Sequence, residues 1–463
     1  MNLSHVQHLY WRAGFGLGPK QLSKLEKNSK EKVVSYLFKN KTKYTPLEID
    51  LSEYEILING SFSKTKKEMG AEAFKMFLKK SRREVRNLNG AWIDRLNTTD
   101  AVFLEKMTLF WANIFVCKDQ NIWHIQQYNN ILRKNALGNF KDFVIAITCA
   151  PSMIDYLNNK QNKKESPNEN FARELMELFT LGAGNYTEND IKESARAFTG
   201  WTYKKRRGFF INKEDHDYGE KTFFGKTGDF DGNHIIDIIL EQKQCARFIC
   251  EKIYRYFVNP TINKIHIEEL TNVFYENYDI KKLMYYIFSS NWFYEKENIG
   301  IKIKSPIELM VGIYRTVPYS FNKPQQALFL QKMMGQVLLY PVNVAGWKGN
   351  TDWIDSNTLM FRLKLSSMLL NNAIINLDAK GDIEDTFEAY YTKRKNAKHY
   401  LKMDISWNIF EKEYKNLDSE KLKNILVLSK INKNTEKMID QLIIKNNKDY
   451  CVQLMSIPEY QLC

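Results

Sequence analysis

The chain has 463 residues, of which 44% are hydrophobic and 26% charged, proportions that fill a large core and exclude disorder as the main state. Lysine and arginine number 68 against 54 acidic residues, so the net charge of +14 favours an anionic partner. No apolar stretch approaches the roughly 20 residues that a membrane span needs. The first residues lack a signal sequence and the six cysteines lack a paired spacing, so we expect a soluble, cytoplasmic protein with reduced thiols.

Helical patterns dominate the chain, and no glycine-rich or proline-rich linker divides it. We therefore expect a mainly α-helical protein, with one large principal domain over residues 1–380 and a C-terminal helical region over 381–463 that packs on it. Two basic runs, Lys79 to Arg86 and Lys204 to Arg207, either contact phosphates or form solvated helix faces, and we favour solvated faces. His124 shares a predicted helix with Tyr128, which favours packing for this histidine.

The clearest helix is predicted from Ser166 to Gly182, in SPNENFARELMELFTLG. Ser166 is a good N-cap, Pro167 suits the first helical position, and Glu169 completes a capping box. Gly182 suits the C-terminal cap.

One face of this predicted helix is polar. At about 100° per residue, a single arc carries Asn170, Arg173, Glu174 and Glu177, opposite a phenylalanine- and leucine-rich side. A solvated face in which Arg173 pairs with Glu177 at i,i+4 explains this pattern. If the face instead lines a cleft, two carboxylates beside an arginine can take different pKa values, so that one of them acts as an acid or a base. Alternatively, the two carboxylates can bind a cation together.

A second helix follows in YTENDIKESARAFTGW, with Thr187 and Asp190 as its cap pattern and Trp201 at its end. After it, aromatic runs broken by glycine predict a small β-hairpin or irregular insertion near residues 203–230. The helical period returns after this insertion and builds core.

The predicted insertion contains His216 next to Asp217, close to Lys221. A histidine beside an acid in an irregular segment is a catalytic candidate, because such segments carry much of the chemistry of enzymes. A structural histidine that is hydrogen-bonded within a loop is the competing interpretation.

Signatures of several enzyme classes are absent from the sequence. The 7 histidines form no HxH, HExxH or HxxxH pair, so a catalytic zinc site has little support and we predict no metal. The chain has no GxGxxG, GxxxxGK[ST] or GxSxG motif, which disfavours dinucleotide enzymes, P-loop ATPases and serine hydrolases. The sequence identifies no cofactor.

Nine separated segments, in order along the chain, resemble the bacterial domain-of-unknown-function 1800 family. The strongest is PNENFARELMELFTLG followed by YTENDIKESARAFTGW. The other segments are HLYWRAGFGLGP, LRKNALGNFKDF, YLNNKQN, HDYGEKTFFGKTGDFDG, KSPIEL, MMGQVLLYPVNVAGW and PEYQL. The resemblance implies a largely helical fold without an established activity.

The polar positions of that family fall on both predicted helices, the aromatic loop and a later segment with Asn343, Gly346 and Trp347. The resemblance implies that these residues cluster in one cleft. Our catalytic candidates are Glu174, Glu177, His216 and Asp217, and our substrate-binding candidates are Asn170, Arg173, Arg196, Trp201 and Lys221.

The chain departs from the family pattern in two ways. Where relatives commonly have two histidines in a segment like FWHNHF, this chain has Ala112 and Ile114. If those histidines act chemically, the chain has lost that chemistry; if they only pack, nothing is lost. Many relatives look exported and are encoded beside the domain-of-unknown-function 1501 family, so a protein of that family is a candidate partner, whereas a periplasmic role is not carried over.

Three functions remain open. An enzyme that performs acid–base chemistry on an anionic or polyhydroxylated substrate requires the candidates to converge in one pocket. A non-catalytic scaffold or binding protein, such as a divergent and inactive family member, is favoured if the polar residues are dispersed or closed into internally paired clusters. Nucleic-acid binding requires both basic runs on one face and ranks last. We narrowly favour the enzyme, because ionic networks used only for structure are costly.

Overall fold

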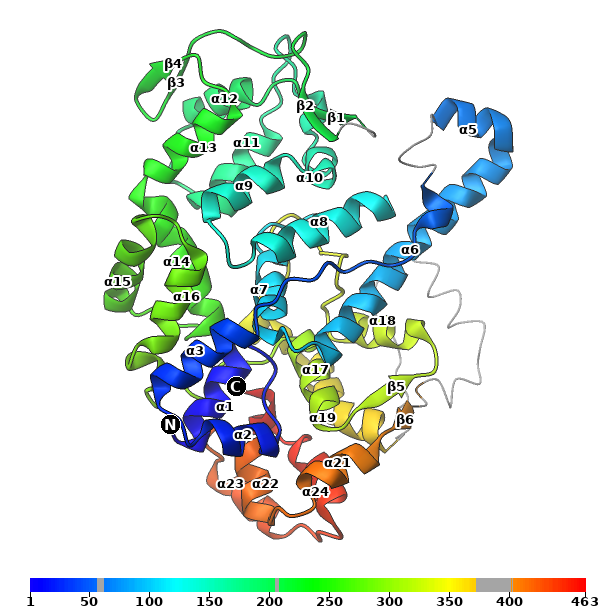
Figure 1. Cartoon of the computed structure of the whole chain (residues 1–463), viewed down its shortest axis with the longest axis vertical. Coiled ribbons are helices and arrows are strands. Elements are labelled where there is room, and N and C mark those ends of the chain that lie inside the picture. The colour runs from blue at the N-terminus through cyan, green and yellow to red at the C-terminus, as the bar shows by residue number, and fades with distance from the viewer. Residues whose placement is uncertain (56–61, 205–207, 372–400, 402) are drawn as a thin grey trace. The chain divides into compact units, whose positions relative to one another are not determined.

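The computed structural model describes residues 1–55, 62–204, 208–371, 401 and 403–463. The described chain is mainly helical, and its strands form three small antiparallel two-stranded sheets (Figure 1). This confirms the predicted fold class. Among the helices of the described residues, none is long and apolar enough to cross a membrane.

The chain folds into two compact units. Unit 1 consists of Met1–Ser29, Ile299–Val337 and Gly349–Cys463, and unit 2 consists of Lys30–Asn298 and Leu338–Lys348. The chain therefore leaves unit 1 and returns to it twice. The predicted boundary between residues 380 and 381 lies outside the described residues and stays a prediction.

Unit 1 is built from helices and one small sheet, in which β5 pairs antiparallel with β6. Its core contains charged side chains: the ammonium of Lys304 lies 3.8 Å from the ring centroids of both Trp11 and Tyr460, where cation–π attraction offsets part of the desolvation. The elements of unit 1 are α1 (Leu3–Arg12), α2 (Pro19–Leu25), α17 (Pro306–Thr316), β5 (Tyr319–Phe321), α18 (Pro324–Met333), η5 (Asn350–Trp353), α19 (Ser356–Leu370), β6 (Met403–Ile405), α21 (Trp407–Tyr414), α22 (Ser419–Leu426), α23 (Lys433–Asp440), α24 (Asn447–Leu454) and η6 (Pro458–Gln461).

Unit 2 contains the signature helices and the first predicted basic run. Its elements up to the signature are α3 (Lys30–Asn40), η1 (Ser52–Tyr54), α5 (Phe62–Met69), α6 (Ala71–Thr98), α7 (Val102–Ala112), α8 (Ile122–Asn135), α9 (Phe140–Thr148), α10 (Pro151–Tyr156), η2 (Asn159–Gln161), α11 (Asn170–Glu174), the π-helical turn η3 (Leu175–Thr180) and α12 (Glu188–Ala197). After the hairpins described below come α13 (Gly232–Glu241), α14 (Lys243–Phe257), α15 (Lys264–Tyr275), α16 (Ile280–Ser289) and η4 (Trp292–Tyr294).

Helix α7 is the centre of the unit 2 core, because every one of its residues before the last is buried. The ring of Trp111 stacks on Phe115 at 5.5 Å and meets Phe143 edge-on at 5.2 Å. Edge-to-face and offset arrangements of this kind are the favoured geometries of aromatic pairs. The aromatic residues of this segment therefore pack into the core of unit 2.

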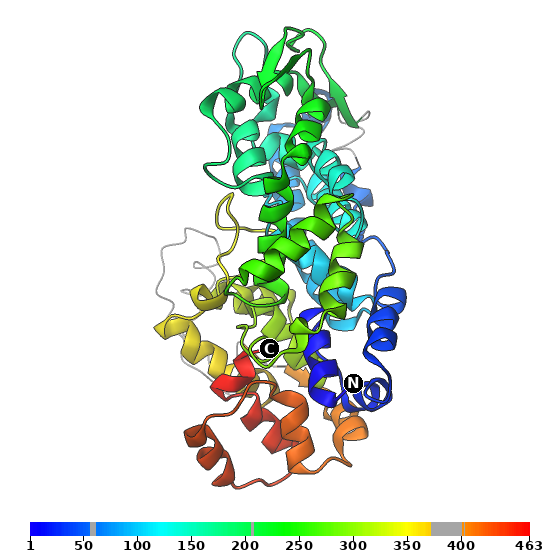
Figure 2. The ribbon, with the colours of Figure 1, turned by 90° about the vertical axis from the view of Figure 1, so that its left-hand side faces the viewer.

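The insertion predicted near residues 203–230 consists of two short hairpins. β1 (Trp201–Lys204) pairs antiparallel with β2 (Gly208–Ile211), and β3 (Lys221–Phe223) pairs antiparallel with β4 (Lys226–Gly228). Both views show the hairpins at one end of unit 2 (Figures 1 and 2). Most of the second basic run, residues 205–207, lies outside the described residues.

The clearest predicted helix begins later than expected. Ser166 forms an isolated bridge with Lys163, and the side chain of Asn168 accepts a hydrogen bond from the backbone N–H of Asn170 at 3.0 Å. The predicted capping box of Ser166 and Glu169 is therefore wrong, because the Asn168 side chain turns the backbone and the helix starts after it. The capping box predicted for α12 is confirmed.

Candidate functional site

Arg173, on α11, is held by two carboxylates. Its guanidinium donates to both carboxylate oxygens of Glu188 at 2.9 Å and to Glu169 at 3.1 Å. The hydrogen bonds to Glu188 raise the pKa of Arg173 above its usual range. Arg173 thus pairs with Glu169 and Glu188, in place of the predicted pair with Glu177.

Glu174 and Glu177 form a carboxylate pair where α11 passes into the π-helical turn η3. The hydroxyl of Tyr186 donates to Glu177 at 2.9 Å. Burial, and to a smaller extent the charge of Glu177, raise the pKa of Glu174 above the usual value for a carboxyl group. Burial and the hydrogen bond to Glu177 raise the pKa of Tyr186 to about 12. Turns of π-helix occur frequently at functional sites.

Two of the predicted substrate-binding residues take part in packing. The side-chain amide of Asn170 donates to the backbone oxygen of Leu157 at 3.0 Å. Trp201 is 1% exposed, and its ring packs edge-on against Phe198 and Phe209. Both side chains therefore contact other residues of the chain and contribute to packing.

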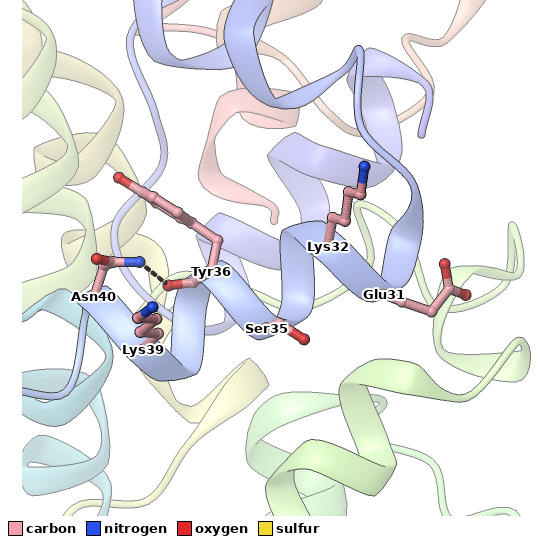
Figure 3. Close-up of a pocket in the computed structure, with 6 residues that line it drawn as sticks. All are labelled: Glu31, Lys32, Ser35, Tyr36, Lys39 and Asn40. Carbon is pink, nitrogen blue, oxygen red and sulfur yellow. Dashed lines mark hydrogen bonds between the residues drawn. The ribbon is translucent and has the colours of Figure 1, made fainter.

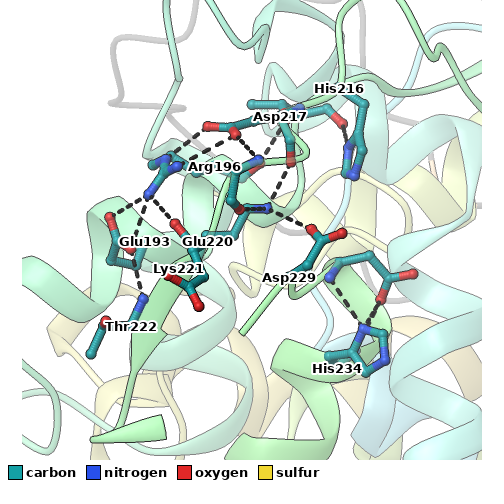
Figure 4. Close-up of polar contacts among 12 residues, drawn as sticks. Glu193, Arg196, His216, Asp217, Glu220, Lys221, Thr222, Asp229 and His234 are labelled. Carbon is teal, nitrogen blue, oxygen red and sulfur yellow. Dashed lines mark hydrogen bonds and ion pairs between the residues drawn. The ribbon is translucent and has the colours of Figure 1, made fainter. Parts of the chain in front are cut away.

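Arg196, in the last turn of α12, connects this helix to the loop between the hairpins (Figure 4). Its Nε and Nη2 donate to Asp217 at 2.7 and 3.4 Å, and its Nη1 donates to Glu193 at 3.0 and 3.1 Å and to the backbone oxygen of Glu220 at 3.1 Å. Burial raises the pKa of Asp217, but the hydrogen bonds from Arg196 and a backbone N–H outweigh it, so this pKa lies below its usual value.

Lys221 and His216 close the same network. The ammonium of Lys221, which is 1% exposed, donates to the backbone oxygens of Asp217 at 2.7 Å and Gly219 at 2.8 Å. The Nδ1 atom of His216 lies 2.7 Å from the backbone oxygen of Thr199 and therefore carries its proton, because a carbonyl only accepts. Each polar side chain of this network is paired within the chain.

The site candidates thus form two groups. Arg173 is tied to Glu188 in the first turn of α12, and Arg196 is tied to Asp217 at the last turn. At 1.5 Å per residue, the eight positions between Glu188 and Arg196 correspond to about 12 Å along the helix. One group, which we call the α12 network, comprises Glu193, Arg196, His216, Asp217 and Lys221; the other comprises Arg173, Glu174 and Glu177.

A family model described as "Protein of unknown function (DUF1800)" matches residues 8–462. The chain belongs to the DUF1800 family. Searches of curated proteins and of solved structures found no match. The match covers nearly the whole chain, as the nine resembling segments predict, and its description assigns no activity.

Ala112 and Ile114, the two positions at which the resemblance to the family implies histidines, lie at the end of α7 and just after it. Ala112 lines a small cavity, and Ile114 is 8% exposed. Between them, the side chain of Asn113 accepts a hydrogen bond from the backbone N–H of Trp347 at 2.7 Å and donates to its backbone oxygen at 2.9 Å. Asn113 therefore holds the segment 338–348 against the end of α7. This segment carries the later motif NVAGW.

A polar cluster that sequence reasoning missed lies beside α8 of this DUF1800 chain. Ser152 donates to Asp119 at 2.9 Å, and His124 Nδ1 lies 3.3 Å from the same carboxylate. The His124 ring meets Tyr203 edge-on, and the Tyr203 hydroxyl donates to Asp155 at 2.5 Å. The cluster joins three segments that are distant in sequence, at residues 119–124, 152–155 and 203, and the only sequence signal for it was an acid shortly before a histidine.

Unit 2 has two shallow surface depressions, and none of the predicted site residues lines either of them. One, of about 440 Å³, follows the solvent-facing side of α3, and Figure 3 shows its six lining residues. The other, of about 410 Å³, lies between α9, α13 and the end of α15, with the ion pair of Lys141 and Asp237 at 2.5 Å on its surface.

Side chains of the metal-ligating types are dispersed over the described residues, and most thiols are buried. Within the described ranges, no three histidine, cysteine, aspartate or glutamate side chains are grouped so that they could hold a metal ion. All six cysteines are free. Burial raises the pKa of Cys117, Cys245 and Cys451, among others, which keeps these thiols protonated and unreactive.

Proposed function

We propose that this protein is a non-catalytic binding protein of the DUF1800 family, in which the α12 network is structural. The observation that supports it is the pairing of the ionic side chains: Arg196, Asp217 and Lys221 all bind partners of the same chain, with the buried His216 bound to a backbone oxygen. A cationic group that is fully occupied in this way has little capacity left for an anionic substrate. The network instead fastens the hairpin loop to α12.

The partner we propose is a protein related to the domain-of-unknown-function 1501 family, as the resemblance suggests. The test mixes the purified chain with such a protein and measures complex formation by size-exclusion chromatography with light scattering. A stable complex supports the proposal. A mixture that stays fully dissociated at tens of micromolar refutes this partner, because weak transient complexes fall in this concentration range. Cell fractionation tests the cytoplasmic location expected from the sequence.

Acid–base catalysis on an anionic or polyhydroxylated substrate is the second candidate, now restricted to Glu174 and Glu177. The raised pKa of Glu174 beside a second carboxylate favours it, because two coupled carboxyl groups can divide the roles of acid and base. In contrast to the α12 network, this pair receives only the hydroxyl of Tyr186 among the hydrogen bonds described above.

A turnover screen separates the two candidates. The chain is incubated with a panel of sugar phosphates and uronic acids, and the products are followed by NMR. Turnover that is lost in Glu174→Gln and retained in Arg173→Met refutes the binding-protein proposal and supports catalysis. Nucleic-acid binding, the third candidate, predicts retention on single- and double-stranded DNA or RNA that falls steeply with salt.

A further inference from the structure

A small cavity in unit 2 lies between helices α6, α7 and α8 and the segment 338–348. Its volume is about 20 Å³. Most of its wall is apolar or aromatic, and its lining residues are Trp92, Ala112, Phe115, Cys117, Ile125, Tyr128, Asn129, Leu132, Leu339, Pro341 and Trp347. A cavity of this kind, lined only by hydrocarbon, stays dry.

One residue breaks the apolar character of the wall. Asn129 is 1% exposed, and neither its side-chain nitrogen nor its side-chain oxygen forms a hydrogen bond with another protein group. Buried polar groups in folded proteins almost always have a partner, and an unpaired amide is strongly unfavourable. The unpaired amide of Asn129 and the cavity it lines therefore require a common explanation.

The segment 338–348 closes the cavity on one side. Leu339, Pro341 and Trp347 contribute to the wall. The segment is held by Asn89, whose side chain donates to the backbone oxygen of Leu338 at 2.7 Å, and by the two hydrogen bonds between Asn113 and Trp347. These hydrogen bonds therefore hold the segment 338–348 in place over one side of the cavity.

We propose that this cavity is a binding site for a single water molecule, held by the side-chain amide of Asn129. The inference is independent of the proposed function. A cavity needs a volume of at least about 10–15 Å³ to hold a water molecule. The volume of about 20 Å³ therefore admits one water molecule and no larger ligand. The water donates to Asn129 Oδ1 or accepts from Nδ2.

Further polar atoms complete the coordination of the water. Buried waters typically make two to four hydrogen bonds. The hydroxyl of Tyr128 donates to the backbone oxygen of Phe115 at 2.6 Å and keeps its lone pairs for a second bond, and the thiol of Cys117 is a weak donor. Asn129, Tyr128 and Cys117 together supply enough partners for one water.

The first test observes the water directly. A crystal structure of the full chain at about 1.5 Å resolution is expected to show a density peak within about 3.2 Å of a side-chain atom of Asn129. Water-oxygen magnetic relaxation dispersion in solution is expected to detect one long-lived water that is missing in Asn129→Leu. A cavity without density and an unchanged dispersion profile in the variant would each overturn the proposal.

A measurement of Tm also distinguishes a dry cavity from one that holds water, because Asn129→Leu is expected to shift Tm in opposite directions in the two cases. If the cavity is dry, Asn129→Leu removes an unpaired amide and raises Tm; if water is bound, the variant deprives the water of its main partner and lowers Tm. Leu132→Met, which changes the same wall without changing its polarity, is the matched control and is expected to shift Tm less than Asn129→Leu. Should Asn129→Leu fail to fold, the crystal structure of the wild-type chain decides.

Discussion

The pairing of Arg196 with Asp217 gives the sharpest test of a structural α12 network. A double-mutant cycle with Arg196→Met, Asp217→Asn and the double variant isolates their coupling from other effects of each substitution. Two hydrogen bonds join the side chains, at 2.7 and 3.4 Å, and the side chains are only 28% and 17% exposed. A charge-assisted hydrogen bond contributes about 1.5–3 kcal/mol when desolvated, whereas exposed ion pairs contribute about 0–1 kcal/mol, so we expect a coupling of about 1–1.5 kcal/mol.

Hydrogen exchange of the α12 amides is the appropriate assay, because a chain with two units need not unfold in a single transition. We expect Arg196→Met to increase the opening of α12 and of the loop around Asp217. Arg173→Met is the matched control, since this arginine also binds two carboxylates but faces solvent, and we expect it to have a much smaller effect. A coupling below about 0.5 kcal/mol, or an equal effect of Arg173→Met, would show that the Arg196–Asp217 pair does not stabilise α12.

Three further variants test other parts of unit 2. Because the folded state raises the pKa of Glu174, this residue's contribution to stability is complete below about pH 4.3 and is lost as pH rises through the folded-state pKa. Glu174→Gln should therefore gain stability relative to wild type as pH rises through the folded-state pKa, measured by urea titrations at several pH values. A difference in stability that does not change with pH contradicts a raised pKa of Glu174. Lys221→Met removes a buried ammonium that donates to the backbone oxygens of Asp217 and Gly219 and should destabilise the chain by about 2 kcal/mol, measured as a shift of the urea midpoint, with an unchanged midpoint as the opposing result. Gly346 has φ 79°, and an added Cβ would lie 2.4 Å from Asn113 Oδ1, so Gly346→Ala should cost at least about 1–2 kcal/mol and lower Tm, and a normal Tm would show that the segment adapts.

Local signals in the sequence predicted the elements whose stabilising contacts are also local. The capping box of α12 joins Thr187 to Asp190, three residues on, and both are visible in the sequence and in the structure. The glycine-broken aromatic runs after α12 predicted a small β-hairpin or an irregular insertion, and the structure has two short hairpins there. The start of α11 was missed because the same stretch contains two competing signals, Ser166 for a capping box and Asn168 for a turn, and the turn prevails.

Long-range pairing and the π-helical turn had no local signal. The 100° helical wheel placed Arg173 next to Glu177, but Arg173 reaches Glu188 on the following helix. The i→i+5 pattern of η3 also shifts the residues after Glu174 away from their expected angles. No local pattern singles out Asn129, because the cavity that it lines forms only once the segment 338–348 is in place.

The division of unit 1 into three separate stretches determines the order in which the molecule can form during synthesis. Residues 30–298 supply most of unit 2 in one continuous run, whereas unit 1 requires Met1–Ser29 together with stretches more than 250 residues later. Unit 2 can therefore begin to fold on the ribosome while the first stretch of unit 1 still waits for its packing partners. For the same reason, no single cut in the chain separates the units into two self-sufficient fragments.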